Sequence, residues 1–169
     1  MIIYIPIKHN SQRVPRKNFR MFEGEPLYKH TLLKFRDERV FVDTDSEEIY
    51  SGINNDKRFT NVTVFYRDNN LVGDKISVCD LLESFILRFE IKDPVIQIHV
   101  TSPFLLKSTI KEAYHNLGKH DSVVSCNIHQ TRFWRKEDYG MCPVNHNPLM
   151  RLNKNTEYVT KLRDLLIEK

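Results

Sequence analysis

The order of apolar and polar residues predicts strands that alternate with helices over most of the chain. Short β-branched apolar runs, bounded by polar or turn-forming residues, predict strands at residues 2–7, 39–43, 62–66, 94–100 and 122–128. Apolar residues at helical spacing predict intervening helices near residues 27–36, through Ile49 and Ile53, and at 76–89 and 107–117. This alternation is typical of a mostly parallel sheet with helices on both faces. We therefore expect a three-layer α/β/α, Rossmann-like fold with right-handed crossovers.

The pattern changes after residue 129. Residues 130–155 lack periodicity and are rich in proline, asparagine and aromatic residues, so we expect an irregular excursion. Residues 156–169 are predicted to be helical, with Val159, Leu162, Leu165 and Leu166 on one side. This helix would lack a C-terminal cap, so we expect one domain over residues 1–169 whose natural sequence continues further.

The most informative segment follows the first predicted strand. It carries a series of basic residues before the first acidic residue, Glu23: Lys8, Arg13, Arg16, Lys17 and Arg20. Ligands of open α/β sheets bind beyond the carboxyl ends of strands, and Pro15 stiffens this loop. Asn10, Ser11 and Asn18 add groups that suit phosphate or sugar oxygens. The segment favours a phosphate site, with a solvated basic loop or a nucleic-acid patch as alternatives.

Composition excludes several classes of protein. The net charge of +4 is modest for a nucleic-acid binder, so we expect no nucleic-acid partner. No apolar run approaches the ~20 residues that cross a bilayer, and no signal-peptide pattern opens the chain, so we expect no membrane association. Cys79, Cys126 and Cys142 are far apart and form no metal motif, which favours reduced thiols and a cytoplasmic location.

The dinucleotide fingerprint and the P-loop motif are both absent from the chain. Four ordered blocks, over about residues 2–135, instead resemble the acylneuraminate cytidylyltransferase family, and more distantly the 3-deoxy-manno-octulosonate cytidylyltransferases. The family loop A-R-x-x-S-x-x-x-P-x-K-N is matched by Ile7, Lys8, Ser11, Pro15, Lys17 and Asn18. The later blocks are matched by Asp43-Thr44-Asp45, by Arg67, Leu71, Asp74 and Ser77, and in part by His99-Val100-Thr101-Ser102-Pro103.

The resemblance implies a nucleotidyltransferase fold of the GT-A-like type and transfer of CMP from CTP to a 2-keto-3-deoxy sugar acid, with release of pyrophosphate. It places a catalytic set on the triphosphate: Lys8, Arg13 and Lys17, with Lys17 on the leaving pyrophosphate. The substrate-binding set is Asn10, Ser11 and Asn18 for phosphate or ribose oxygens, Arg67 and Ser77 for cytidine, and Thr101, Ser102 and His99 for the sugar.

The chain departs from the family pattern at several positions. Lys8 replaces an arginine, which keeps the charge but loses the bidentate fork. His99 and Val100 replace glutamine and proline beside the expected sugar site. The family also implies Mg²⁺ held by a carboxyl-terminal D-x-D, which has no counterpart here, so the magnesium ligands are not expected in this chain. A homodimer is implied for the full-length protein.

Alternatives remain for the function and for single residues. The chain can instead be a catalytically inactive nucleotide-binding fragment, or act on an octulosonate, pseudaminate or legionaminate. His99 can be a core residue, and Thr101-Ser102-Pro103 can end a strand and cap the next helix. Asp74 can cap the helix at 76–89, and Arg67 can pair with Asp68 or Glu48. For the acidic run 43–48 we prefer helix capping, with Asp45 or Ser46 as the N-cap, to a metal site.

Overall fold

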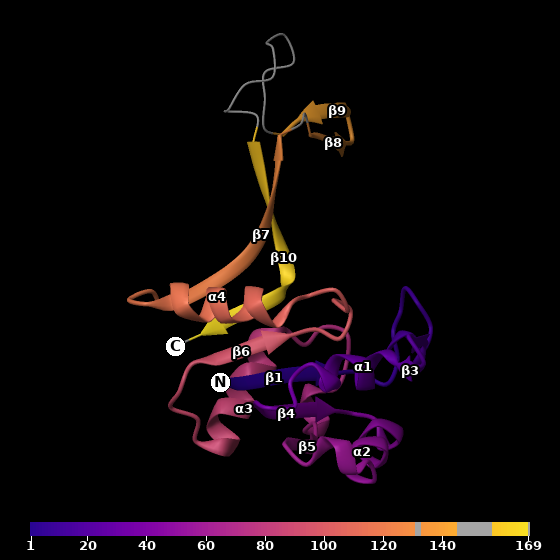
Figure 1. The fold of residues 1–169 in the computed structure, drawn as a ribbon. Helices are drawn as coiled ribbons and strands as arrows, with labels where there is room; N and C mark the ends of the chain where they lie inside the picture. The colour runs from indigo at the N-terminus through magenta and orange to yellow at the C-terminus, as the bar shows by residue number, and fades with distance from the viewer. Residues whose placement is uncertain (131–132, 145–156, 169) are drawn as a thin grey trace. The chain divides into compact units, whose positions relative to one another are not determined.

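The main sheet of the protein has six strands and is mostly parallel in its core. The computed structural model describes residues 1–130, 133–144 and 157–168. The strands are β1 (Ile2–Ile7), β4 (Arg39–Thr44), β5 (Val62–Tyr66), β6 (Val95–Ile98), β7 (Ser122–Gln130) and β10 (Glu157–Glu168) (Figure 1). Their order in the sheet is β5-β4-β1-β6-β10-β7. β1 pairs in parallel with both β4 and β6, and β4 pairs in parallel with β5.

In the described part of the chain, four α-helices connect or follow these strands. They are α1 (Leu27–Leu33), α2 (Glu47–Asn54), α3 (Val78–Phe89) and α4 (Lys107–Leu117), with 3-10 turns η1 (Lys17–Phe19), η2 (Lys57–Phe59) and η3 (Asn69–Leu71). Ser46 is the N-cap of α2, because its Oγ accepts a hydrogen bond from the Ile49 N–H at 3.3 Å. The capping interpretation of the acidic run is therefore confirmed.

Helices cover both faces of the sheet. On β1, Ile3, Ile5 and Ile7 pack in one buried cluster with residues of α1, α2 and α4. The alternate residues Ile2 and Tyr4 pack in a second cluster with Leu81, Leu82 and Phe85 of α3. Since successive side chains of a strand point to opposite faces, the clusters lie on opposite sides of the sheet. The predicted three-layer α/β/α fold is confirmed, and each buried apolar side chain contributes roughly 1.5–3 kcal/mol.

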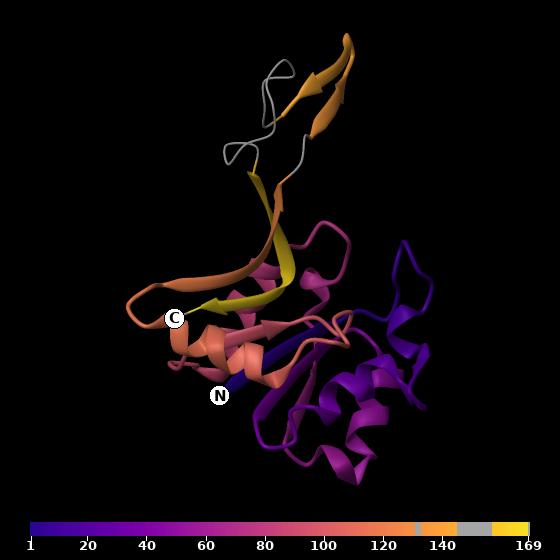
Figure 2. The same ribbon diagram turned by 45° about the horizontal axis from the view of Figure 1, so that its top comes forward.

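The predicted helix at residues 156–169 is wrong, because the described part of this segment is strand β10. β10, the yellow strand of Figure 2, pairs antiparallel with β6. Their register sets Leu165 opposite Ile98 and Ile167 opposite Ile96. Apolar residues at helical spacing favoured a helix, but the free edge of β6 supplies backbone hydrogen-bonding partners that a strand can use. Tertiary pairing therefore outweighs the local pattern.

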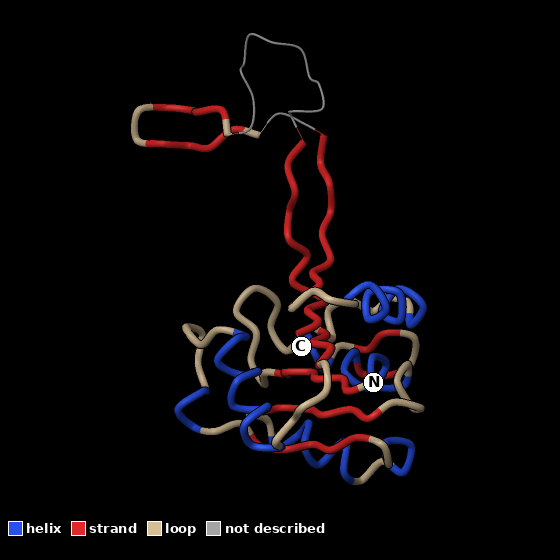
Figure 3. Tube along the Cα trace, turned by 90° about the vertical axis from the view of Figure 1, so that its left-hand side faces the viewer, coloured by secondary structure: helices blue, strands red, loops and turns tan. Residues whose placement is uncertain are grey.

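Residues 124–163 group into a second compact unit, separate from residues 1–123 and 164–169. The second unit contains the antiparallel hairpin of β8 (Trp134–Glu137) and β9 (Gly140–Pro143), so part of the predicted irregular excursion is regular (Figure 3). In the first unit, β2 (Met21–Phe22) and β3 (Glu25–Pro26) form a smaller two-stranded sheet. No described helix has the length and apolar character needed to cross a membrane. A single domain that continues past residue 169 stays a prediction.

Candidate functional site

A cleft of about 610 Å³ opens where β1, β5 and β6 end. Its walls come from the loop after β1, from Arg67 after β5, from the segment after β6 and from the first turns of α3. Most of the residues predicted to bind substrate line it: Lys8, Asn10, Ser11, Arg13, Lys17, Asn18, Arg67, His99 and Thr101. The fold thus brings together residues from three distant segments, while their individual roles stay predictions.

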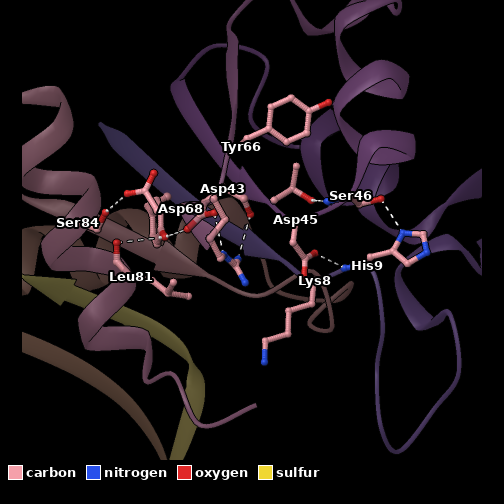
Figure 4. A network of polar contacts seen from close by, with 12 residues as sticks. Lys8, His9, Asp43, Asp45, Ser46, Tyr66, Asp68, Leu81 and Ser84 are labelled. Atoms are coloured by element: carbon pink, nitrogen blue, oxygen red, sulfur yellow. Dashed lines mark hydrogen bonds and ion pairs between the residues drawn. The ribbon is translucent and has the colours of Figure 1, made fainter. Parts of the chain in front are cut away.

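The basic loop after β1 is anchored to the start of α2. The backbone N–H of His9 donates to Asp45 Oδ1 at 2.6 Å, and His9 Nδ1 lies 2.8 Å from Ser46 Oγ (Figure 4). Farther along the loop, Arg16 Nη2 forms an ion pair with Glu48 at 2.7 Å. Arg16 has a positive φ of 51°, which turns the chain sharply into η1. These contacts hold both ends of the loop, which restricts the positions that its cationic side chains can occupy.

Asn18 closes the loop back onto its own beginning. Its side chain is 3% exposed, and its Nδ2 donates to the Lys8 carbonyl oxygen at 2.8 Å. In the described part of the chain, Asn18 Oδ1 is buried and has no hydrogen-bond partner. A buried acceptor without a donor is costly, so a ligand hydroxyl or amine at this point of the cleft would be stabilised.

The mouth of the cleft is crossed by contacts to Asp74. Lys8 Nζ lies 2.5 Å from the carbonyl oxygen of Gly73 and 3.4 Å from Asp74 Oδ1. Gln12 Nε2 donates to Asp74 Oδ2 at 2.5 Å. Asp74 does not cap α3, because the N-cap of this helix is Ser77. The Lys8 and Asp74 side chains are 36% and 61% exposed, so water screens their pair and a bound polyanion can replace the carboxylate.

A buried polar network lies behind Arg67. Arg67 Nε donates to Asp43 Oδ1 at 2.9 Å, and Arg67 Nη2 contacts the Asp43 carbonyl oxygen at 3.3 Å. The Tyr4 hydroxyl donates to Asp43 Oδ2 at 2.5 Å. The alternative that Arg67 pairs with Asp68 or Glu48 at the surface is wrong, because Arg67 is buried and pairs with Asp43 of the neighbouring strand β4. Burial, reinforced by the Asp43 charge, raises the pKa of Tyr4, so this hydroxyl stays a donor.

The predicted sugar-side residues divide into two groups. His99 and Thr101 line the cleft, and His99 Nε2 lies 3.2 Å from Gln97 Nε2. His99 is half-buried, so it is not a core residue. Ser102 is not among the described lining residues, and its backbone takes part in two consecutive turns. The alternative that residues 101–103 cap the next helix is wrong, since Leu106 is the N-cap of α4.

Ser77 performs a structural task in the protein. It is the N-cap of α3, with its Oγ accepting from the Asp80 N–H at 3.1 Å in a capping box. It is not among the described residues that line the cleft, so its predicted contact with cytidine has no geometric support.

Sequence reasoning missed the roles of Asp43 and Tyr4. One signal was available: Asp43 ends an apolar strand, and a buried carboxylate needs a partner. The neighbouring sequence could not identify the partners of Asp43, because Tyr4 lies in β1 and Arg67 directly follows β5. Asp74 was noticed, but its contacts with Lys8 and Gln12 depend on how two loops meet.

The described residues do not supply a complete protein site for Mg²⁺. They contain no group of three or more His, Cys, Asp or Glu side chains placed to hold a metal ion. Among the described residues lining the cleft, Asp74 is the one carboxylate, and Lys8 and Gln12 already contact it. The described residues therefore do not fit the Mg²⁺ ion that the resemblance implies.

An open, mostly parallel sheet with a cationic cleft beyond the carboxyl ends of its strands defines an α/β protein whose ligand site lies at the strand ends. A family model described as Cytidylyltransferase matches residues 2–160, and the chain belongs to this family. The predicted family resemblance is thereby confirmed.

Relatives and solved structures agree with this assignment. The chain is 31% identical over 132 residues to an N-acylneuraminate cytidylyltransferase of Streptococcus agalactiae, covering 73% of this chain and 31% of that protein. It is 30% identical over 126 residues to a pseudaminic acid cytidylyltransferase of Campylobacter jejuni, covering 70% and 53% respectively. A CMP:2-keto-3-deoxy-manno-octonic acid synthetase complexed with CTP superimposes with a TM-score of 0.66 at 14% identity, over 99% of this chain and 73% of that one. The chain thus spans about a third to a half of these curated relatives.

Proposed function

We propose that this chain binds CTP in the cleft and transfers CMP to a 2-keto-3-deoxy sugar acid, with release of pyrophosphate. The observation that carries the proposal is the convergence of Lys8, Arg13 and Lys17 with Arg67 and Thr101 on one cleft. The names of the relatives, which are cytidylyltransferases for N-acylneuraminate and pseudaminic acid, support the same substrate class.

The proposed reaction is a substitution at the α-phosphorus of CTP. The anomeric hydroxyl oxygen of the sugar acid forms a bond to this phosphorus, the bond from phosphorus to the α,β-bridging oxygen breaks, and pyrophosphate leaves with that oxygen. The hydroxyl proton passes to solvent. Lys8, Arg13 and Lys17 would neutralise the triphosphate, with Lys17 on the departing pyrophosphate. Such catalysis consists mainly of positioning and charge stabilisation, which an arrangement of cations supplies.

The remaining cleft residues would orient the two substrates. Asn10, Ser11 and Asn18 would contact phosphate or ribose oxygens. Arg67 would face the cytidine, beside the apolar side chains of Val78 and Leu81 that suit a pyrimidine ring. Thr101 and His99 follow β6, which lies on the other side of β1 from β4 and β5, and they would contact the sugar. An Mg²⁺ ion with ligands from outside this chain, a homodimer of the full-length protein and a cytoplasmic location are further parts of the proposal.

The experiment measures pyrophosphate release from CTP and Mg²⁺ with a panel of sugar acids: N-acetylneuraminate, pseudaminate, legionaminate and octulosonate. We expect release with one of them and about a hundredfold loss in Lys17→Ala, because one cation less faces the leaving group. Lys92→Ala is the matched control, since Lys92 is exposed and precedes β6, at the opposite edge of the sheet.

Two results would count against the proposal. Full activity in Lys17→Ala would contradict the role of that residue. CTP binding without turnover on any sugar would favour a catalytically inactive nucleotide-binding chain.

A further inference from the structure

Three buried side chains from neighbouring parts of the sheet form one polar network behind the cleft wall. Tyr4 lies in β1, Asp43 near the end of β4, and Arg67 directly after β5. They are 0%, 3% and 5% exposed. Asp43 joins them, because each carboxylate oxygen accepts one hydrogen bond: Oδ1 from Arg67 Nε and Oδ2 from the Tyr4 hydroxyl. The carboxylate is therefore held from two sides.

This arrangement determines which nitrogen atoms of the Arg67 guanidinium are used by Asp43. Nε and Nη2 of Arg67 are directed at the side chain and carbonyl oxygen of Asp43. Nη1 is buried and has no hydrogen-bond partner among the described residues. Arg67 is also one of the residues that line the cleft, so the unsatisfied donor belongs to a side chain of the cleft wall. An acceptor atom on a bound ligand would remove the cost of that buried donor.

The part of the cleft beside Arg67 differs from the basic loop. Leu81 lines the cleft there, and its carbonyl oxygen lies 3.4 Å from the Tyr4 hydroxyl. Ile76 and Val78 extend the apolar lining. Apolar walls with one convergent donor suit a heterocyclic base that carries acceptor atoms, whereas phosphates suit the cations of the loop.

We propose that Tyr4 and Asp43 are positioning residues that hold Arg67 with Nη1 turned to an acceptor atom of the nucleoside. This inference rests on the proposed function, because it takes CTP as the ligand of the cleft. Tyr4 acts only through Asp43, and Asp43 only through Arg67, so neither contacts the nucleotide. Their effect is on recognition of the base and not on the binding of phosphate.

The test is isothermal titration of the folded chain with two probes, CTP and inorganic tripolyphosphate. Tyr4→Phe removes the hydroxyl but keeps the ring that stacks on Phe85 at 4.6 Å. We expect it to weaken CTP binding about fivefold and to leave tripolyphosphate binding unchanged, because one hydrogen bond to the orienting carboxylate is lost. Asp43→Asn, which removes the charge at constant shape, is expected to weaken CTP binding about tenfold with the same selectivity.

Tyr28→Phe is the matched control, because Tyr28 is a buried tyrosine of α1 outside the cleft lining. It should change the affinity for neither probe. Equal losses for CTP and tripolyphosphate in Tyr4→Phe and Asp43→Asn would mean a structural role only and would overturn the inference. So would unchanged CTP binding in both variants. A wild-type chain that binds tripolyphosphate but not CTP would instead overturn the proposed function itself, and the inference with it.

Discussion

The two walls of the cleft use charge in opposite ways. One wall, formed by the loop after β1, carries Lys8. The side chains of Lys8 and its partner Asp74 are 36% and 61% exposed, and their closest charged atoms are 3.4 Å apart. The other wall carries Arg67, with Asp43 behind it. These two side chains are 1% and 4% exposed, and their charged atoms are 2.9 Å apart. Water screens the first pair, so it contributes little and exchanges partners easily. The second pair is desolvated, so losing either partner is costly.

The comparison indicates a division of labour within the cleft. Exposed cations on a loop can follow a triphosphate whose charge and position change during a reaction. A buried, doubly held guanidinium cannot move, so it suits the part of a substrate that stays unchanged. Rigidity and adaptability are thus set by burial and not by the kind of charge.

The largest expected difference between the walls is in stability. Arg67→Ala leaves Asp43 buried without its ion-pair partner, and we expect a loss of about 3–5 kcal/mol in the free energy of unfolding. Arg13→Ala on the exposed loop should change this free energy by no more than about 0.5 kcal/mol. Urea denaturation measures both. Similar values for the two variants would abolish the contrast between the walls.

A second difference is expected at alkaline pH. Unfolded tyrosine ionises near pH 10, and the folded pKa of Tyr4 is raised by burial and by Asp43. A raised folded pKa gives stability that is complete below pH 10 and falls as pH rises above it, by about 1.4 kcal/mol per pH unit and proton. In Tyr4→Phe, the free energy of unfolding should therefore fall less steeply above pH 10, because one proton fewer is released on unfolding.

Tyr28→Phe provides the comparison for this measurement. Burial raises the pKa of Tyr28 to about 12, so its contribution to the slope should end near that pH. If Tyr4→Phe leaves the slope above pH 10 unchanged, the hydroxyl is not the buried donor of the network.

The smallest expected effect concerns Asp74. Asp74→Asn removes the carboxylate that competes with a polyanion for Lys8, so tripolyphosphate affinity should rise about twofold at low salt and lose this gain at high salt. Asp93→Asn is the control, since Asp93 is exposed and precedes β6. Titration calorimetry at two salt concentrations measures both variants. A decrease in affinity for Asp74→Asn would indicate that Asp74 supports the loop more than it competes with the ligand.

The sequence predicted the strands and helices of residues 2–128 because each element has its own periodic signal. The short apolar run of β1 and the spacing of α3 are local features, and packing agrees with them. β10 was predicted incorrectly because its conformation depends on a distant partner, the edge of β6. A local pattern cannot report a pairing with a strand so far away along the chain.

The candidate site follows the same rule. The cations and short polar groups of the loop after β1 were found because they are consecutive in sequence and end a strand. The network of Tyr4, Asp43 and Arg67 was missed because its members are contributed by three separate segments. A surface ion pair of Arg67, the alternative to its predicted contact with cytidine, was reasonable for a charge in a polar loop, and only the fold reveals that Arg67 is buried.

The place of β10 in the sheet has a consequence for the newly made chain. β1, β4 and β5 can assemble with β6 as soon as residues up to Ile98 have left the ribosome, but β10 follows only after many further residues. Until then, one side of β6 presents unpaired backbone groups to any strand nearby. A nascent or nicked protein lacking residues 157–168 would therefore be prone to aggregate, and chaperone protection during translation would matter most in that interval.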